Sequence, residues 1–260
     1  MTAGREGDAM EQRADQYDDN QRSYRTYWDG RGYEHDAEVA ALRRLLAGRH
    51  FGHAADVGGG YGRLVPVLRE FADRVTLLDS SRRQLQDAEE YLAGLAGVTM
   101  RLTTVAGLGL RSGSVDLVTM VRVMHHLPDP APALAEIARV LRPGGTAVVE
   151  SANLAHAANR LRYAARRRRV PRQPVDIRSA ANRERDSIPF VNHHPATVAA
   201  QLEAAGLRVQ QRLSVSNLRS TRLKRVVSRG ALARAEVALQ RPLARVTFGP
   251  SIFFLVRKAA

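Results

Sequence analysis

The sequence predicts an α/β protein built on a doubly wound, mostly parallel sheet with helices on both faces. Two observations carry this prediction. Between about residues 51 and 151, short apolar runs alternate with segments whose apolar side chains recur at helical spacing. The apolar runs also lack the polar alternation of a sheet with one face in water, so helices should cover both faces.

The predicted elements follow in order along this region. Strands are expected at residues 53–57, 74–79, 98–105, 115–123 and 146–151. Helices are expected at residues 81–95, at residues 131–141, and where apolar residues recur at Leu64, Val67, Leu68 and Phe71. Pro143-Gly144-Gly145 should end the helix at 131–141.

The regular alternation stops after residue 151. We therefore divide the chain into an N-terminal helical cap (1–50), a cofactor-binding core (51–151), a basic lid insert (152–190) and a C-terminal part of the same domain (191–260). The last part should contain a helix at 195–205, a strand at 207–216, a basic helix and a closing strand at 251–257.

Composition excludes several classes of protein. The 260 residues are 44% hydrophobic and 25% charged, which is typical of a globular chain. Cysteine is absent, which rules out disulfides, cysteine-ligated metals and a thiolate nucleophile. The N-terminus has no apolar signal core, and no run approaches the ~18–20 apolar residues that span a bilayer, so we expect a cytoplasmic protein. We expect no metal, because Asp116 and Asp129 are not clustered with further ligands.

The net charge of +14 comes from two segments. Residues 156–186 and residues 218–245 each carry +7, and the remainder of the chain is neutral. Such segments are typical of a solvated or mobile surface. They could instead bind an anionic small-molecule substrate, an acidic carrier protein, a membrane face or RNA. Nucleic acid is disfavoured, because the chain has neither an Asn/Asp-Pro-Pro-aromatic motif nor an appended RNA-binding module.

A glycine-rich loop follows the first strand, in the stretch Asp56-Val57-Gly58-Gly59-Gly60-Tyr61-Gly62. Glycines let a loop turn tightly and approach a ligand without Cβ clashes. Arg63 stands where a dinucleotide fingerprint needs its last glycine, and the Gly-Lys-Ser/Thr of a phosphate-binding P-loop is missing. A tight turn of another doubly wound protein is the alternative explanation.

Four motifs in this order resemble the class I S-adenosylmethionine-dependent methyltransferases. They are the Asp-x-Gly-x-Gly-x-Gly loop, Asp79 at the end of the second strand, residues 112–129 (SGSVDLV followed by MHHLPD) and residues 141–145 (LRPGG). The chain looks most like the small-molecule branch that includes the quinone-biosynthesis C-methyltransferases. The resemblance covers residues 50–151, and 190–217 with 249–257 more loosely, and it implies a Rossmann-like fold.

The resemblance also implies which residues hold S-adenosylmethionine and its product S-adenosylhomocysteine. Asp79, with Ser80 beside it, would accept both ribose hydroxyls. Thr104 and Val105 would flank the adenine, a departure from the family's usual Asp-Ala pair. The methionine end would be held by Asp56, Gly58, Gly60 and Gly62, with Val121 and Arg122 lining its channel.

Four histidines are candidates for a general base, namely His125, His126, His193 and His194. We expect at least one of them to lie within reach of the transferred methyl group. The structural alternatives are packing beneath a loop for His125 and His126, and helix-start capping for His193 and His194 before Pro195.

Aromatic residues gather near the N-terminus, where Tyr17, Tyr24, Tyr27, Trp28 and Tyr33 make up five of the fourteen in the chain. We expect Tyr17 and Tyr24 to seat a helix on the sheet. Trp28 and Tyr33 should line the pocket, where their ring faces could hold the sulfonium or stack on an aromatic acceptor.

These inferences predict an enzyme that moves a methyl group from S-adenosylmethionine to O, N or C of a small metabolite, in specialised or quinone metabolism. The acceptor would be anionic or aromatic. The alternatives are an RNA- or carrier-protein-associated methyltransferase, or a non-catalytic cofactor-binding protein, acting through residues 156–186 and 218–245.

Overall fold

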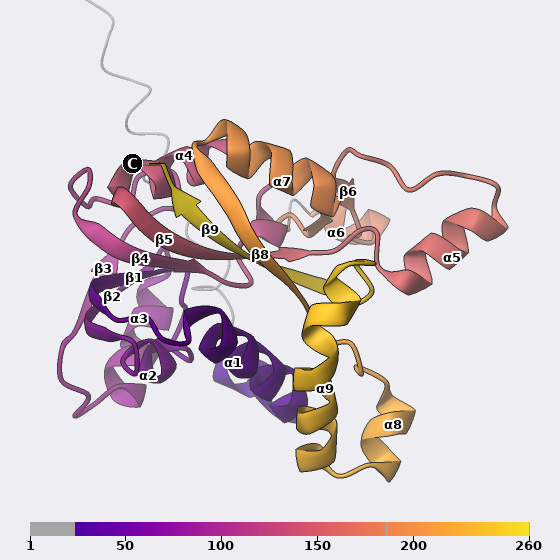
Figure 1. The fold of residues 1–260 in the computed structure, drawn as a ribbon, viewed down its shortest axis with the longest axis horizontal. Helices are drawn as coiled ribbons and strands as arrows, with labels where there is room; N and C mark the ends of the chain where they lie inside the picture. Colours follow the sequence, from indigo (N-terminus) through magenta and orange to yellow (C-terminus); the bar gives the residue numbers. More distant parts are fainter. Residues whose placement is uncertain (1–23, 186, 260) are drawn as a thin grey trace, which may run out of the picture.

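The fold was analysed in a computed structural model, which describes residues 24–185 and 187–259. Seven strands form one sheet in the order β3-β2-β1-β4-β5-β9-β8 (Figure 1). The strands are β1 (Phe51–Val57), β2 (Ala72–Asp79), β3 (Val98–Leu102), β4 (Val115–Met120), β5 (Leu141–Ala152), β8 (Leu207–Val215) and β9 (Ser251–Lys258).

Strands β1 to β5 run parallel, and β9 lies antiparallel between β5 and β8. The strand order reverses at β1, where β2 lies on one side and β4 on the other. In doubly wound sheets such a reversal opens a crevice at the carboxyl ends of the strands, where ligands bind. The predicted fold class, a doubly wound and mostly parallel sheet, is confirmed.

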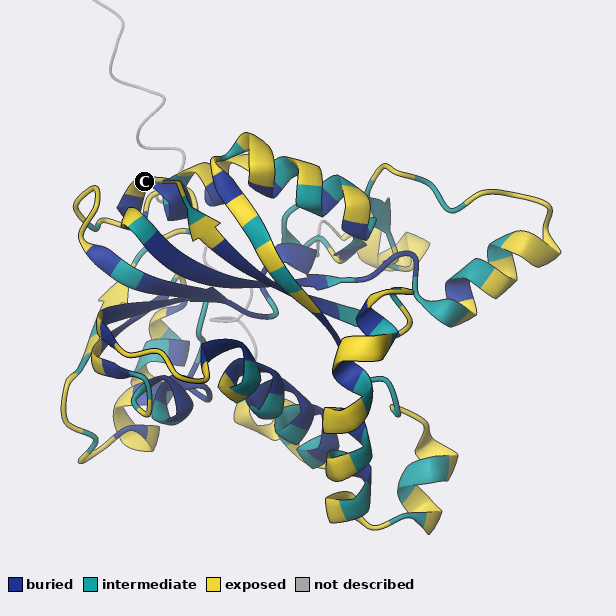
Figure 2. Ribbon diagram, in the orientation of Figure 1, coloured by how far each residue is buried: buried dark blue, intermediate teal, exposed yellow. Residues whose placement is uncertain are grey.

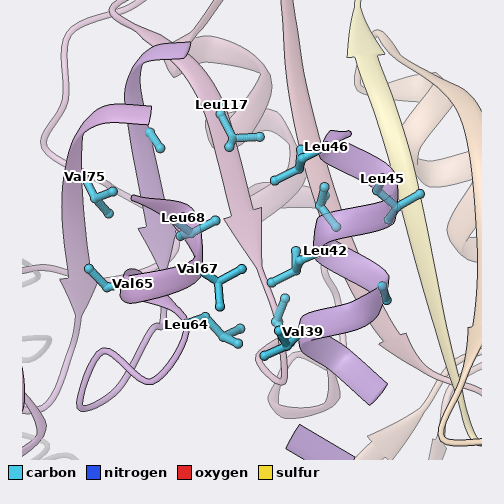
Figure 3. Close-up of a cluster of buried hydrophobic side chains, with 14 of the residues drawn as sticks. Val39, Leu42, Leu45, Leu46, Leu64, Val65, Val67, Leu68, Val75 and Leu117 are labelled. Carbon is cyan, nitrogen blue, oxygen red and sulfur yellow. The ribbon is translucent and has the colours of Figure 1, made fainter. Parts of the chain in front are cut away.

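Helices cover both faces of this sheet (Figure 1). The helices on one face are α1 (Gly32–Leu46), α2 (Val65–Leu68) and α3 (Arg82–Tyr91), and their apolar residues join one buried cluster. Figure 3 shows Leu42 of α1 pointing toward Val67 of α2, and Leu46 of α1 pointing toward Leu117 of β4. The other face is covered by α4 (Ala131–Val140) and α7 (Pro195–Ala204), which belong to a second cluster.

The predicted basic lid is an excursion between β5 and α7. It contains α5 (Ala157–Ala165), a two-stranded sheet of β6 (Val175–Asp176) with β7 (Val191–Asn192), and α6 (Ala180–Glu184). Helix α5 projects from the body and is largely exposed (Figure 2). The second basic segment forms α8 (Thr221–Val226) and α9 (Arg229–Ala244), and α9 packs against α1 and β8.

Two predicted boundaries need correction. The apolar pattern from Leu64 to Phe71 contains only the four-residue helix α2, because turns occupy residues 60–64 and Arg69 caps its end. Helix α4 ends at Val140, but Leu141 already pairs with Val115 of β4, so Pro143-Gly144-Gly145 lies within β5.

None of the described helices is both long and apolar enough to cross a membrane.

Candidate functional site

A cavity of about 800 Å³ opens at the carboxyl ends of β1, β2 and β4, where the strand order reverses. The predicted site residues that line this cavity are Trp28, Asp56, Gly58, Gly60, Asp79, Ser80, Thr104, Val105, Val121, Arg122 and His126. The predicted residues that do not line it are Tyr33, Gly62, His125, His193 and His194. Eleven of the predicted site residues thus share one cavity, and their roles in binding stay predictions.

The glycine loop and Asp79 meet directly in this cavity. The Gly60 amide donates to Asp79 Oδ2 at 2.8 Å, and the Ser81 amide donates to Asp79 Oδ1 at 2.9 Å. Ser81 then caps α3 by accepting from the Gln84 amide. These hydrogen bonds fix the carboxylate at the end of β2 against the loop at the end of β1.

The backbone amides of the glycine loop donate hydrogen bonds within the protein. Gly58 and Gly59 both donate to the Leu78 carbonyl, at 2.7 and 3.2 Å, and Gly62 donates to Gly59. The amides of Gly58, Gly59 and Gly62 are therefore already paired within the protein. Gly62 also points away from the cavity wall, and a Cβ there would lie 2.6 Å from Leu92 Cδ1.

The glycines act through shape instead. Gly58 has φ +63°, and a Cβ on it would lie 2.4 Å from Val123 Cγ2. A Cβ on Gly59 would lie 2.4 Å from Leu77 Cδ1 and 2.5 Å from Asp56 Oδ2. Side chains at these positions would displace the cavity wall and the Asp56 carboxylate, so the loop is restricted to glycine by contact as well as by backbone conformation.

Asp56 is a buried carboxylate with one oxygen that lacks a hydrogen-bond partner among the described residues. Its Oδ1 accepts from Thr119 Oγ1 at 2.6 Å, while the buried Oδ2 has no hydrogen-bond partner among the described residues. Burial raises the pKa of Asp56 from 3.8 to about 6, and the Thr119 hydrogen bond opposes that shift. A cation or hydrogen-bond donor in the cavity would satisfy Oδ2 and stabilise the charged form.

A buried ion-pair cluster joins the N-terminal cap to the cavity. Glu38 of α1 is 3% exposed and binds two arginines, Arg63 at 2.5 Å and Arg122 at 2.6 Å. The Arg63 guanidinium lies 3.6 Å from the centre of the Trp28 ring, and that of Arg122 lies 4.9 Å from it. Because protein cations already contact Trp28, its predicted role as a cation–π partner of a sulfonium is not supported.

Two expectations for the cap aromatics are wrong. Tyr33 is 4% exposed and lies away from the cavity, where its hydroxyl donates to Glu236 of α9 at 2.6 Å. Tyr24, expected to seat a helix, lines the cavity instead, as part of the 3₁₀ helix η1 (Tyr24–Trp28). The expectation for Tyr17 lies outside the described residues.

Of the four candidate histidines, His126 lines the cavity. It belongs to the 3₁₀ helix η2 (Met124–His126), and its Nδ1 lies 2.9 Å from the Pro189 carbonyl of the lid. A carbonyl only accepts, so Nδ1 carries the proton, and Nε2 holds the lone pair when the ring is neutral.

The other three histidines have structural roles. His125 is buried between His126 and Phe190, with ring centroids 4.0 and 4.5 Å away, and desolvation holds its pKa well below 6.5. His193 is 1% exposed and lies 3.1 Å from the Met124 carbonyl through Nε2. His194 caps α7 by accepting from the Ala196 amide. Their candidacy as general bases is not supported by this placement.

The lid contributes residues to the cavity that sequence reasoning did not identify, namely Arg185, Ile188 and Pro189. Glu38 and Arg63 were also missed. The sequence did contain a hint of Arg63, because this residue directly follows the last glycine of the loop. No sequence pattern linked Glu38 to Arg122, which lies 84 positions away. Among the described residues, no group of three or more His, Asp or Glu could hold a metal ion.

Comparison with known proteins agrees with this geometry. A family model described as a methyltransferase domain matches residues 55–149. Over 110 residues the chain is 34% identical to a ubiquinone biosynthesis O-methyltransferase of Methylococcus capsulatus, covering 42% of this chain and 45% of that protein. Over 133 residues it is 35% identical to the methyltransferase AacuQ of Aspergillus aculeatus, covering 50% and 42%. The match thus spans less than half the length of either relative.

Solved structures extend the likeness across most of the chain. A SAM-dependent methyltransferase from Thermotoga maritima superposes with a TM-score of 0.64, covering 93% of this chain and 97% of that chain at 17% identity. At this identity the likeness concerns the fold. Residues 55–149 thus match a methyltransferase domain, and the solved structure shows the same fold over most of the chain.

Proposed function

We propose that this protein transfers a methyl group from S-adenosylmethionine to an O, N or C atom of a small-molecule acceptor. The observation that carries the proposal is the juxtaposition, in one cavity, of the side-chain-free loop, the Asp79 carboxylate and the unpartnered Asp56 oxygen. These groups match a nucleoside that carries a cationic amino-acid chain.

The residues of the cavity fit this cofactor group by group. Asp56 Oδ2 would accept from the ammonium of the methionine end, close to Gly58, Val121 and Arg122. Asp79 would accept from the ribose hydroxyls, with Ser80 beside it. Thr104 and Val105 would border the adenine.

The bound cofactor supplies a methyl group on a sulfonium, already activated for displacement. The protein must then align an acceptor with that group and exclude water. Two segments far apart in the sequence line the cavity, the cap with Tyr24 and Trp28 and the lid with Ile188 and Pro189. His126, whose ring is oriented by the Pro189 carbonyl, is the candidate general base of this cavity.

A small acceptor is supported by the cavity and by the names of the relatives. A volume of about 800 Å³ lies within the range of sites for small molecules. Of the arginines in the two basic segments, Arg185 lines the cavity, whereas the rest lie elsewhere on the described surface. The likeness to a ubiquinone biosynthesis O-methyltransferase favours an oxygen atom as the methyl acceptor.

The test is calorimetric titration of S-adenosylhomocysteine into wild type and Asp79→Asn. Loss of a charged acceptor for two hydroxyls should weaken binding by about 10- to 100-fold. Asp73→Asn is the matched control, since Asp73 is an exposed carboxylate of the same strand that pairs with His50. Equal affinities of the Asp79→Asn protein and wild type would exclude the proposed ribose contact, and absence of binding to wild type would exclude the function.

A further inference from the structure

The two basic segments leave the sheet at the same edge as the cavity. Strand β9 runs antiparallel to both β5 and β8, so β5 and β8 run in the same direction. Residues 153–190 follow β5 and residues 216–250 follow β8, so both start at the carboxyl edge of the sheet, where the cavity opens. The segments also touch, because the Ala157 amide of α5 donates to the Phe248 carbonyl at 2.9 Å. The topology therefore gathers at one edge the positive charge that the sequence carries in two places.

Each of the two basic segments also exposes apolar side chains. Among the described residues, the two large apolar side chains with the greatest exposure are Val226 of α8, at 80%, and Leu161 of α5, at 73%. Where the segments touch, Val246 is 49% exposed and Phe248 is 39% exposed. Helices α5 and α8 both lie toward the right of Figure 1, at the same end of the molecule. Apolar side chains in water beside many positive charges are typical of a surface that binds a partner.

Most of the arginines near these side chains are free to meet an external anion. Arg166–Arg169 directly follow α5, and Arg222 and Arg225 belong to α8. All of them are exposed, and none forms an ion pair with another residue in the described ranges. Lys224 differs, because it pairs with Glu34 of α1 and so attaches α8 to the body of the protein.

We propose that α5 with Arg166–Arg169, α8 and residues 245–248 form a surface that docks on a membrane of anionic lipids. The guanidinium groups contact lipid phosphates, and Leu161 and Val226 enter the boundary between headgroups and acyl chains. A polyanion such as RNA would engage the arginines but would leave both apolar side chains in water. The docked protein holds its cavity beside the bilayer, because the cavity opens at the same edge. This inference does not depend on the proposed function.

The test is co-sedimentation with vesicles, made either of equimolar phosphatidylglycerol and phosphatidylcholine or of phosphatidylcholine alone. Leu161→Gln combined with Val226→Gln removes the two exposed apolar groups at constant charge, and replacing Arg166–Arg169 by glutamine removes the charge. The matched control is Tyr91→Gln combined with Leu102→Gln, since these apolar residues lie outside both segments and are each 40% exposed. Melting temperatures check that every variant is folded. A labelled single-stranded RNA is titrated in parallel.

Wild type and the control should bind the anionic vesicles about tenfold or more tightly than vesicles of phosphatidylcholine alone, because anionic lipids attract arginine. Each of the two test variants should lose about tenfold or more of its affinity for the anionic vesicles, since insertion and charge both contribute.

Three outcomes would overturn the proposal. If wild type binds RNA but not the anionic vesicles, the surface is a nucleic-acid site. If Leu161→Gln with Val226→Gln binds these vesicles as tightly as wild type does, charge alone governs the attraction and nothing inserts. An equal loss in the control would show that the binding surface lies elsewhere on the protein.

Discussion

Asp56 combines two features that make ligand binding depend on pH. Its Oδ2 is buried without a partner, and burial raises its pKa to about 6. A protonated carboxyl group cannot accept from an ammonium as strongly as a carboxylate does. The proposed contact of Asp56 with the ligand ammonium therefore requires the deprotonated form, which dominates only above pH 6.

We predict that S-adenosylhomocysteine affinity falls about tenfold between pH 7 and pH 5, since roughly a tenth of Asp56 stays ionised one unit below its pKa. The stability of the fold changes with pH in the opposite direction to ligand affinity. A raised pKa in the folded protein means that this residue destabilises the fold progressively as pH rises from about 4 to 6. Calorimetry across this range checks the binding prediction. Asp56→Asn should bind weakly with a flat profile, and a tenfold fall that persists in Asp56→Asn would assign the titration to another group, such as His126 or His35.

Single residues also show where sequence reasoning reached its limit. The sequence indicated Asp79 and Asp56, because each ends a strand and polar groups at strand ends meet at one edge of a sheet. It could not indicate that Glu38 would contact Arg63 and Arg122, because those contacts depend on how α1 packs across the sheet edge. Tyr33 was misplaced for the same reason. Its helix and a basic helix in the C-terminal part were both expected, but the contact between them was not.

At the scale of elements, apolar periodicity predicted burial better than it predicted helix length. Leu64, Val67 and Leu68 are buried as expected, yet α2 has only four residues because the glycine turn extends to its start. In β5, the Pro143-Gly144-Gly145 stretch joins the strand because Leu141 pairs with Val115, and the register then shifts before Leu117 pairs with Thr146. Pairing across strands is decided by tertiary contact, which local patterns do not contain.

Tyr33 makes one of the buried polar contacts that attach α9 to α1. Tyr33 Oη donates to Glu236 Oε2 and accepts from the Leu218 amide at 2.9 Å, and Glu236 is fully buried. Tyr33→Phe removes both hydrogen bonds and leaves the amide and one carboxylate oxygen with fewer partners. We predict a loss of about 1–3 kcal/mol in the free energy of unfolding, measured by urea titration. Tyr91→Phe, at a 40% exposed position, should change it by less than about 0.5 kcal/mol. Equal stability of the two variants would contradict this role of Tyr33.

At the scale of the whole molecule, the net charge of +14 is distributed unevenly. Arg166–Arg169 are all exposed, and none of them forms an ion pair with a described residue. They also lie outside the cavity lining. A local cluster of unpaired charges produces a stronger field near itself than the same charges dispersed over the surface.

Replacing Arg166–Arg169 by glutamine should therefore weaken the attraction of the protein to polyanions. Its affinity for S-adenosylhomocysteine and its thermal stability should stay the same. We predict S-adenosylhomocysteine affinity within about twofold of wild type and a melting temperature within about 2 °C, because exposed unpaired charges contribute little to stability. The matched control replaces four dispersed exposed arginines, Arg49, Arg82, Arg111 and Arg208, which changes the net charge equally. On a heparin column the clustered variant should elute at lower salt than this control. Identical elution would show that total charge rather than its clustering governs the attraction, and a lowered melting temperature would show that the arginine run supports the fold.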